Sequence, residues 1–244
     1  MTEELSSAWE ADPARQPANF RDLGGLPLAG GATRPGVLYR SDAMYPGDRA
    51  PADAPAWPPA TVIDLRSPGE AAAGYPWPAG VSVHRIPLLR RAAVLTDPSA
   101  QGLTLQALYE TALRAVPDRL AGLVGLAADA PGPVLVHCAA GKDRTGVAVA
   151  VLLLVAGAEP ATVIGDYTAT AARMPVLLGR LDTLGRRLPA DAGAHPELLG
   201  TPVAAITVVT EQLTGWPGGP VGWLTDHGGS AAAAARWRDR LLAS

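Results

Sequence analysis

Cysteine is almost absent from this chain, because Cys138 is the only one among 244 residues. A single cysteine excludes an intramolecular disulfide, and an unpaired thiol is typical of proteins in a reducing compartment. The first residues, Met1-Thr2-Glu3-Glu4, lack the basic and apolar regions of a signal peptide. The sequence therefore predicts a cytoplasmic protein.

A long hydrophobic run and an excess of positive charge are also missing. The longest apolar run, Val147 to Ala158, is too short for a bilayer, which takes about 20 residues to cross, and a buried helix explains it better. The formal net charge is -3, whereas general nucleic-acid binding usually needs a basic face. We therefore expect neither stable membrane insertion nor a nucleic-acid partner.

Patterns of metal ligands are missing as well. His84, His195 and His227 do not have the spacing of metal ligands, and no oxygen-rich cation site is evident in the sequence. We therefore predict no metal and no other cofactor.

Hydrophobic residues are plentiful, at 48% of the chain, and so a sizeable core can form. The length suits a single domain that spans residues 1–244. The first 19 residues are polar and contain prolines. They are predicted to form a mobile arm, with Phe20 packed at its end.

Apolar and β-branched segments alternate with helical patterns until about residue 155. Strands are predicted at 36–40, 61–65, 81–86 and 134–137, a loop or a broken helix at 46–59, and a loop at 88–103. Helices are predicted at 104–115, with Thr104 as the cap, and at 117–128, 144–155 and 231–242. Strands separated by helices, followed by helices only, indicate an α/β fold with a small central sheet, flanking helices and a helical C-terminal part.

One segment carries a pattern of chemical groups. Residues 137–146 read His-Cys-Ala-Ala-Gly-Lys-Asp-Arg-Thr-Gly, between a predicted strand and a predicted helix. A short loop in that place can direct its backbone N–H groups at one point, and the helix N-terminus adds partial positive charge. Glycine permits the backbone angles that such a turn needs. The pattern predicts a phosphate site formed by Ala139, Ala140, Gly141, Lys142, Asp143 and Arg144.

The same residues suit a reaction that uses a cysteine nucleophile. Helix N-termini and cationic neighbours favour the thiolate form, so Cys138 is predicted to attack phosphorus as a thiolate. Arg144 can donate two parallel hydrogen bonds to phosphate oxygens, which lysine cannot do. Thr145 can donate its hydroxyl to the sulfur and help it leave in the second step. His137 is expected to orient the loop rather than to act as a base.

Two other interpretations explain these residues less well. A lone cysteine on an apolar strand is usually a small buried hydrophobic residue, but that does not account for Gly141, Arg144, Thr145 and Gly146 at fixed spacing. A nucleotide-binding P-loop needs Ser or Thr directly after Gly-Lys, where this chain has Asp143.

The loop resembles that of the cysteine-dependent protein tyrosine phosphatase superfamily. Its Gly-Lys-Asp-Arg is similar to the bacterial tyrosine/serine and phosphoinositide phosphatase family. Further motifs of that family match over most of the chain: Asn19 to Gly25, Leu38 to Asp42, Val62 to Ser67 and, more loosely, Asp166-Tyr167 and Gly222 to Leu224. The resemblance implies the cysteine-dependent phosphatase fold with a helical lid, here at 175–200. It also implies a metal-independent phosphomonoester hydrolase, with a phosphocysteine intermediate, that acts on phosphotyrosine or phosphoserine proteins or on phosphoinositides.

The resemblance leaves the proton donor open. In that family the lysine of the loop widens acceptance toward phosphoinositides and the aspartate is a proposed general acid, which assigns these roles to Lys142 and Asp143. Alternatively, both are a solvated loop charge or a charge at the helix N-terminus. The Trp-Pro-Asp of larger tyrosine phosphatases is absent, because Ala79 follows Trp77-Pro78. Asp97, in the predicted loop at 88–103, is the other candidate.

Two more aspartates are weighed as acids. Asp42 and Asp64 lie near strand ends, where structural ion pairs with Arg40, Arg66 or Arg21 are the favoured interpretation. Arg90-Arg91 could flank an anionic substrate, although a solvated strand end is favoured.

Other functions of a cysteine loop fit less well than a phosphatase. Arsenate reduction needs further cysteines, sulfurtransferases usually lack the Arg-Thr ending, and non-catalytic phosphate-binding modules typically lose the cysteine or the arginine. The expected partner is therefore a phosphorylated substrate. The residues leave protein, phosphoinositide, and small metabolite or nucleotide substrates open, because specificity depends on loop depth and lid shape.

Overall fold

The computed structural model describes residues 12–72, 74–88, 104–186 and 199–243, and its centre is a five-stranded sheet in the order β1-β4-β7-β5-β6. The strands are β1 (Arg21–Asp22), β4 (Leu38–Ser41), β5 (Thr61–Asp64), β6 (Ser82–Arg85) and β7 (Val134–His137). β1 is antiparallel to β4, whereas the other pairs are parallel. The carboxyl ends of β4, β5, β6 and β7 therefore meet at one edge. A separate ribbon pairs β2 (Pro27–Leu28) with β3 (Gly31–Ala32).

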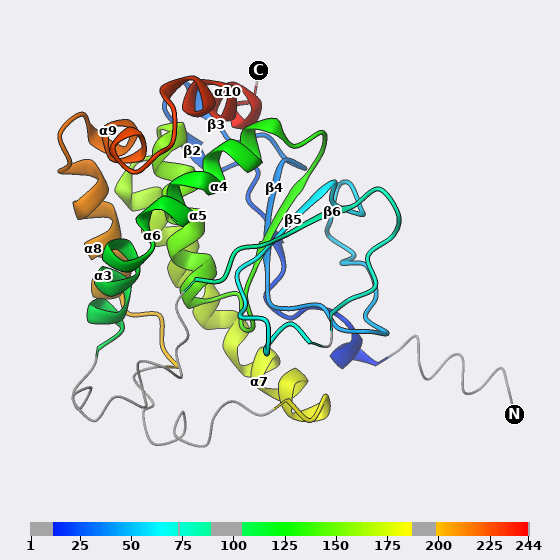
Figure 1. Cartoon of the computed structure of the whole chain (residues 1–244). Helices are drawn as coiled ribbons and strands as arrows, with labels where there is room; N and C mark the ends of the chain where they lie inside the picture. Colours follow the sequence, from blue (N-terminus) through cyan, green and yellow to red (C-terminus); the bar gives the residue numbers. More distant parts are fainter. Residues whose placement is uncertain (1–11, 73, 89–103, 187–198, 244) are drawn as a thin grey trace, which may run out of the picture.

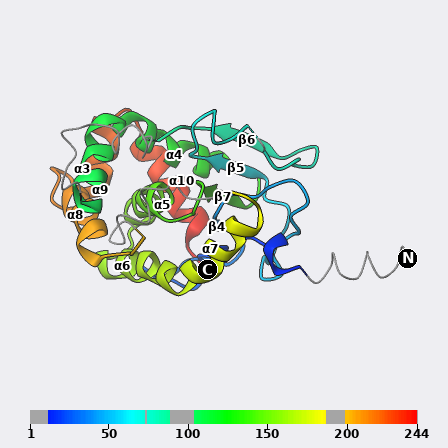
Figure 2. The same cartoon turned by 90° about the horizontal axis from the view of Figure 1, so that it is seen from below.

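Helices cover one face of the sheet and surround α5 (Asp143–Ala156), which lies in their middle (Figures 1 and 2). Every residue of α5 from Thr145 to Ala156 is buried, because apolar residues occupy all sides of the helix. The surrounding helices are α3 (Leu105–Ala115), α4 (Pro117–Asp129), α6 (Pro160–Ala169), α8 (Val203–Thr214), α9 (Gly219–Asp226) and α10 (Ala231–Leu241). The helix α7 (Met174–Thr183) packs instead against the short 3-10 turn η1 (Pro13–Arg15).

Loops cover the opposite face of the sheet, on the right-hand side of Figure 1. An aromatic and aliphatic cluster lies beneath them, with partly buried Trp57 and Trp77 packed on four buried side chains: Phe20, Tyr39, Val62 and Leu135. The burial of Phe20 confirms its predicted packing. The proline-rich stretch at 46–59 forms a loop, which is one of the two structures predicted for it, and not a broken helix.

The predicted helices and strands are confirmed, with small shifts at their ends. Thr104 caps α3, because its hydroxyl accepts a hydrogen bond from the backbone N–H of Ala107 at 3.2 Å. The strand predicted from residue 36 begins at Leu38, since Gly36 has a φ of 76° and cannot be part of an extended strand. The two-residue strands β1, β2 and β3 were not predicted, because two residues carry no periodic pattern.

Residues 12–19, which we expected to belong to a mobile arm, lie against the fold. Asn19 is fully buried, and Ala18 is buried with three residues of α7: Met174, Leu177 and Leu181. Residues 1–11 of the expected arm and 187–198 of the expected lid lie outside the described residues. The first part of the expected lid forms α7 and packs on the N-terminal segment.

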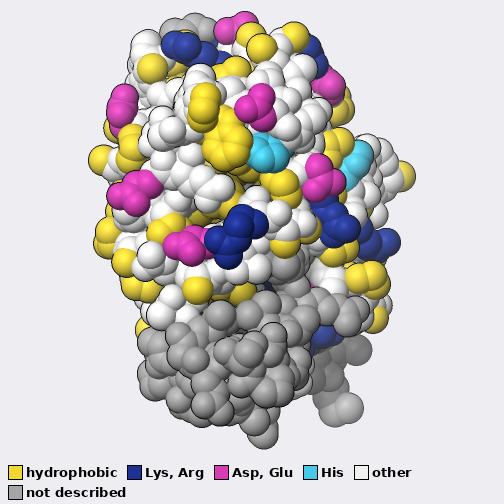
Figure 3. Space-filling model, turned by 60° about the vertical axis from the view of Figure 1, so that its left-hand side comes forward, with side chains coloured by type: hydrophobic (Ala, Val, Ile, Leu, Met, Phe, Trp, Pro, Cys, Tyr) yellow, Lys and Arg dark blue, Asp and Glu magenta, His cyan; other side chains and the backbone are white. Residues whose placement is uncertain are grey.

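None of the helices in the described part of the chain is both long enough and apolar enough to cross a membrane. On the face shown in Figure 3, acidic and basic side chains are interspersed among hydrophobic and neutral ones. The described part of that face therefore carries no uniform charge.

Candidate active site

Residues 138–144, which we call the cysteine loop, connect β7 to the first turn of α5 at the carboxyl edge of the sheet. Gly141 has a φ of 66°, and a Cβ atom there would lie 2.3 Å from the carbonyl oxygen of Ser41. Only glycine fits both this angle and this approach. Cys138 lies at the beginning of the loop and is 3% exposed. The segment thus makes the tight turn between strand and helix that its sequence predicts.

Side chains from the N-terminal part of the chain hold the cysteine loop from outside. Asn19 donates from Nδ2 to the carbonyl oxygens of Ala140 and Gly141, both at 3.0 Å. Arg40 donates from Nη2 to the Gly141 oxygen at 2.8 Å. Because the N–H of a trans peptide points away from its C=O, the N–H groups of Gly141 and Lys142 are turned the other way. They are available for an anion inside the turn.

A buried ion cluster supports these donors. Asp166 on α6 accepts from Arg21 Nε at 2.8 Å and from Arg40 Nη1, and Arg21 also donates to Asn19 Oδ1 at 2.8 Å. Although burial raises the pKa of Asp166, the two guanidinium groups lower it below its ordinary value. We expected Asp42 and Asp64 to pair with Arg40, Arg66 or Arg21. Neither Arg40 nor Arg21 is paired with them, because α6 brings Asp166 between these two arginines.

Arg144 is held by a residue that sequence reasoning missed. Its Nη1 and Nη2 atoms donate to the two carboxylate oxygens of Glu70 at 2.8 and 2.7 Å. Glu70 also accepts from the backbone N–H of Ser67 at 2.9 Å. Burial raises the pKa of Glu70, but the hydrogen bonds and charge of Arg144 outweigh it and lower the pKa to about 2. The guanidinium is therefore fixed in orientation at the start of α5.

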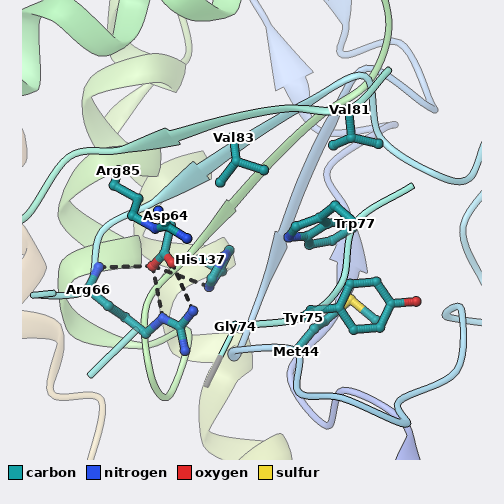
Figure 4. Close-up of a pocket in the computed structure, with 10 residues that line it drawn as sticks. All are labelled: Met44, Asp64, Arg66, Gly74, Tyr75, Trp77, Val81, Val83, Arg85 and His137. Atoms are coloured by element: carbon teal, nitrogen blue, oxygen red, sulfur yellow. Dashed lines mark hydrogen bonds and ion pairs between the residues drawn. The ribbon is translucent and has the colours of Figure 1, made fainter. Parts of the chain in front are cut away.

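Asp64 pairs with Arg66, one of the partners that we expected for it. Arg66 donates from Nε and Nη2 to the two oxygens of Asp64 at 2.9 and 2.8 Å (Figure 4). Burial raises the pKa of Asp64, but the hydrogen bonds from Arg66 outweigh it. His137 lies beside this pair, with Nδ1 at 3.9 Å from Asp64 Oδ1. Burial lowers the pKa of His137 to about 4, so its ring is neutral. Its Nδ1 also lies 3.3 Å from the Cys138 carbonyl oxygen.

Asp42 lies behind the cysteine loop and is fully buried. Its Oδ1 accepts from the backbone N–H of Asn19 at 2.8 Å, and its Oδ2 lies 3.5 Å from Arg180 Nε. Arg180, on α7, donates mainly to Asp48 Oδ2, at 2.5 Å, and to the Gln16 carbonyl, at 2.7 Å. Burial raises the pKa of Asp42 to about 6 in spite of the nearby Arg180. Sequence reasoning missed Arg180 and Asp48 as partners.

Lys142 and Asp143 belong to one hydrogen-bonded chain. Lys142 is 1% exposed, and its Nζ donates to Asp143 Oδ1 at 2.6 Å and to the Gly200 carbonyl at 2.9 Å. Tyr109 on α3 donates to the same Oδ1 at 2.8 Å, and its hydroxyl lies 2.8 Å from that of Tyr167 on α6. Lys142 is therefore not a solvated loop charge. Sequence reasoning named Tyr167 only as part of a loose family motif, and it did not single out Tyr109.

Of the remaining predicted site residues, the structure describes Thr145 only. Thr145 is fully buried, and its hydroxyl has no hydrogen-bond partner among the described residues. Asp97, Arg90 and Arg91 lie outside the described residues. Within the described ranges, no group of three or more His, Cys, Asp and Glu residues is arranged to hold a metal ion.

Comparison with known proteins agrees with this geometry. A model described as the tyrosine phosphatase family matches residues 13–243. The chain is 29% identical to the triple specificity protein phosphatase PtpB of Mycobacterium tuberculosis, over 98% of this chain and 98% of that protein. It is 46% identical to a tyrosine-protein phosphatase of Nostoc commune over 19% of this chain and 16% of that protein. The family match therefore includes the whole cysteine loop.

The buried carboxyl of Asp42 leads to a prediction about stability. Its pKa is raised to about 6, so the folded state binds this proton more tightly than the unfolded state does. The resulting stabilisation is present below about pH 4 and is lost as the pH rises through about 6. Asp42→Asn cannot titrate. We therefore expect the free energy of unfolding of wild type, relative to this variant, to fall by about 1–3 kcal/mol between about pH 4 and pH 7.5.

Urea unfolding at the two pH values measures this difference, and comparison with the variant cancels other titrating groups such as His137. Asp239→Asn, at an exposed position on α10, is the matched control. It should give the same difference from wild type at both pH values. An Asp42→Asn difference that does not change with pH would contradict the raised pKa.

Proposed function

Because the chain belongs to the tyrosine phosphatase family, and so to the cysteine-dependent phosphatases, we propose that it hydrolyses phosphomonoesters through a phosphocysteine formed on Cys138. The observation that carries the proposal is the geometry of the cysteine loop. Cys138 directly follows a buried strand, Arg144 lies in the first turn of α5, and donors outside the loop hold the carbonyls of Ala140 and Gly141. The N–H groups left inside can bind a phosphate dianion.

The reaction takes two steps in this proposal. The Cys138 thiolate attacks phosphorus, a P–S bond forms, and the P–O bond to the leaving group breaks as that oxygen gains a proton. Water then attacks the phosphorus, the P–S bond breaks, and inorganic phosphate leaves while the thiolate is restored. Arg144 and the loop amides stabilise the charge on the phosphoryl oxygens in both steps. The unbonded hydroxyl of Thr145 can donate to the sulfur as it leaves.

The pair with Glu70 supports the role of Arg144 as the phosphate clamp. A guanidinium has five N–H donors, and Glu70 accepts one from each Nη atom. The Nε–H and the second Nη2–H are not bonded to Glu70. They lie parallel along the adjacent edge of the planar guanidinium. They can donate to two oxygens of one phosphate, while Glu70 keeps the group from rotating.

We propose Asp143 as the general acid. Tyr109 and Lys142 both donate to its Oδ1, and its Oδ2 has no partner among the described residues, so Oδ2 is free to carry the proton. Asp42 and Asp64 are less suitable, because both are buried in contact with arginines. Asp97 is the runner-up on the grounds of its sequence position alone.

The proposed substrates are phosphotyrosine or phosphoserine proteins, or phosphoinositides. The breadth stated in the name of the Mycobacterium relative supports wide acceptance. Lys142 is placed to contribute a charge if its ammonium turns from the Gly200 carbonyl toward a second anionic group. A small phosphorylated metabolite or nucleotide would undergo the same chemistry, and a panel of phosphopeptides, phosphoinositides and small phosphates distinguishes the classes.

The nucleophile is tested by Cys138→Ser. Serine is similar in size but does not ionise here, so kcat should fall by at least about a thousandfold while the fold and phosphate binding remain. Turnover of an aryl phosphate and binding of inorganic phosphate by calorimetry measure the two properties. Activity within about tenfold of wild type would refute the cysteine mechanism.

The absence of a metal from the proposed reaction is tested by chelation. Arg144 and the loop amides supply the charge that a metal would supply, so EDTA should leave kcat unchanged and vanadate should inhibit. Loss of activity on chelation, with recovery on addition of Mg²⁺ or Zn²⁺, would contradict the proposal.

The general acid is tested by the leaving group. Asp143→Asn should slow hydrolysis of alkyl phosphates and phosphotyrosine by about a hundredfold or more, and that of aryl phosphates with acidic phenols by less than about tenfold. Plotting log kcat/KM against the pKa of the leaving group measures the difference in slope. Asp64→Asn is the control, because it should lower stability by weakening the pair with Arg66 but should not produce this difference between leaving groups. Equal slowing of both kinds of substrate would assign Asp143 to loop geometry instead.

A further inference from the structure

A cavity of about 250 Å³ lies on the loop-covered face of the sheet, next to the cysteine loop (Figure 4). Strand β6 and the segment 74–77 form its walls, and Asp64, Arg66 and His137 lie at its base. His137 directly precedes Cys138, so the cavity and the proposed active site share a wall. The volume is below the range of roughly 300–1,000 Å³ that is usual for small-molecule sites. It suits one or two amino-acid side chains.

The two ends of the cavity differ in chemistry. Arg66 and Arg85 lie at one end, and the rings of Tyr75 and Trp77 lie at the other, with centroids 4.7 Å apart (Figure 4). Arg66 is neutralised by Asp64, whereas Arg85 is exposed and has no hydrogen bond or ion pair among the described residues. His137 is neutral, because burial lowers its pKa to about 4. The cavity therefore has one uncompensated positive charge beside an aromatic surface.

The strand above the cavity is an unpaired edge of the sheet in the described structure. The backbone N–H groups of Ser82 and Ile86 donate toward β5, to the Ala60 and Asp64 carbonyls, at 3.0 and 2.9 Å. Successive N–H groups of a strand point in opposite directions, so those of Val83 and Arg85 point outward. No described residue accepts from them. Such an edge can pair with an extended peptide.

We propose that this cavity is a peptide subsite, in which Arg85 binds an acidic side chain close to the phosphorylated residue of a protein substrate. This inference rests on the proposed phosphatase function and narrows its substrate class. Asp64 on β5 is the register partner of both Arg85 on β6 and His137 on β7. Strands lie about 4.8 Å apart, so the Arg85 backbone is about 10 Å from that of His137. Extended residues advance about 3.4 Å each, which places the acidic residue roughly two to four positions from the phosphorylated one.

A phosphoinositide headgroup fits the same cavity less well. Each further phosphate of a headgroup brings close to two negative charges, and the cavity offers one uncompensated cation. The rings of Tyr75 and Trp77 and the side chain of Val83, which is 38% exposed, provide apolar surface that a polyphosphate would leave unused. A peptide uses all three features: a carboxylate for Arg85, apolar side chains for the rings, and backbone groups for the edge of β6.

The test compares two phosphotyrosyl peptides that differ only in carrying Glu or Gln at the positions two to four residues from the phosphotyrosine. Wild type should show a kcat/KM about three- to fivefold higher for the Glu peptide, mainly through KM. Arg85→Gln should remove this preference, and Val83→Glu, which places a negative charge in the cavity, should reverse it. Arg236→Gln, which removes an exposed arginine on α10, is the matched control and should keep the preference.

Three results would overturn the subsite. The first is a Glu preference that is unchanged in both Arg85→Gln and Val83→Glu. The second is an equal loss in Arg236→Gln, which would indicate a general effect of charge. The third is a loss in Arg85→Gln that is confined to soluble inositol polyphosphates, which would assign the cavity to a headgroup. Hydrolysis of a small aryl phosphate should be the same in all variants, and its absence from wild type would refute the phosphatase proposal instead.

Discussion

The close approach of Gly141 to Ser41 is the constraint on which the rest of the site depends. A Cβ at Gly141 would lie 2.3 Å from the Ser41 carbonyl oxygen, so the cysteine loop can turn this tightly only where a glycine passes the end of β4. Ser41 and His137 are register partners, and the sheet therefore fixes where the turn begins. In this turn the carbonyl oxygen of Gly141 accepts hydrogen bonds from Asn19 and Arg40, two residues of the N-terminal part of the chain.

Buried arginines around that turn are each matched by a carboxylate, because an unpaired buried charge is costly. Arg40 is paired with Asp166, Arg66 with Asp64, and Arg180 with Asp48. Arg144 is different, because its partner Glu70 is half-exposed and accepts on one side of the guanidinium only. The buried ion pairs thus stabilise the fold around the turn. Arg144, in the first turn of α5, keeps N–H donors that can bind an incoming anion.

The local features of this site could be predicted from the sequence, and the long-range ones could not. The strand, turn and helix around Cys138 follow from β-branched residues, a glycine and an apolar run that are adjacent in the chain. The partner of Arg40 is Asp166, 126 residues away, whereas Asp42 is the neighbour that the sequence offers. Glu70 likewise carries no local signal of its pairing with Arg144. Which carboxylate reaches an arginine depends on the packing of α6 and the loop after β5, and that packing is a property of the whole fold.

In the sheet, the strand that leads to the proposed nucleophile is central, and the strand that borders the proposed peptide subsite is at the edge. The cysteine loop extends from β7, the central strand, whose neighbours β4 and β5 are buried on both faces and allow little change. β6 is at the edge, and most of its residues are exposed. A substitution at Arg85 or Val83 alters the proposed peptide subsite without disturbing the contacts of Gly141 or Asn19. His137, Asp64 and Arg85 are register partners across the sheet. We therefore expect substrate preference to vary most readily at Arg85, where a substitution disturbs the fold least.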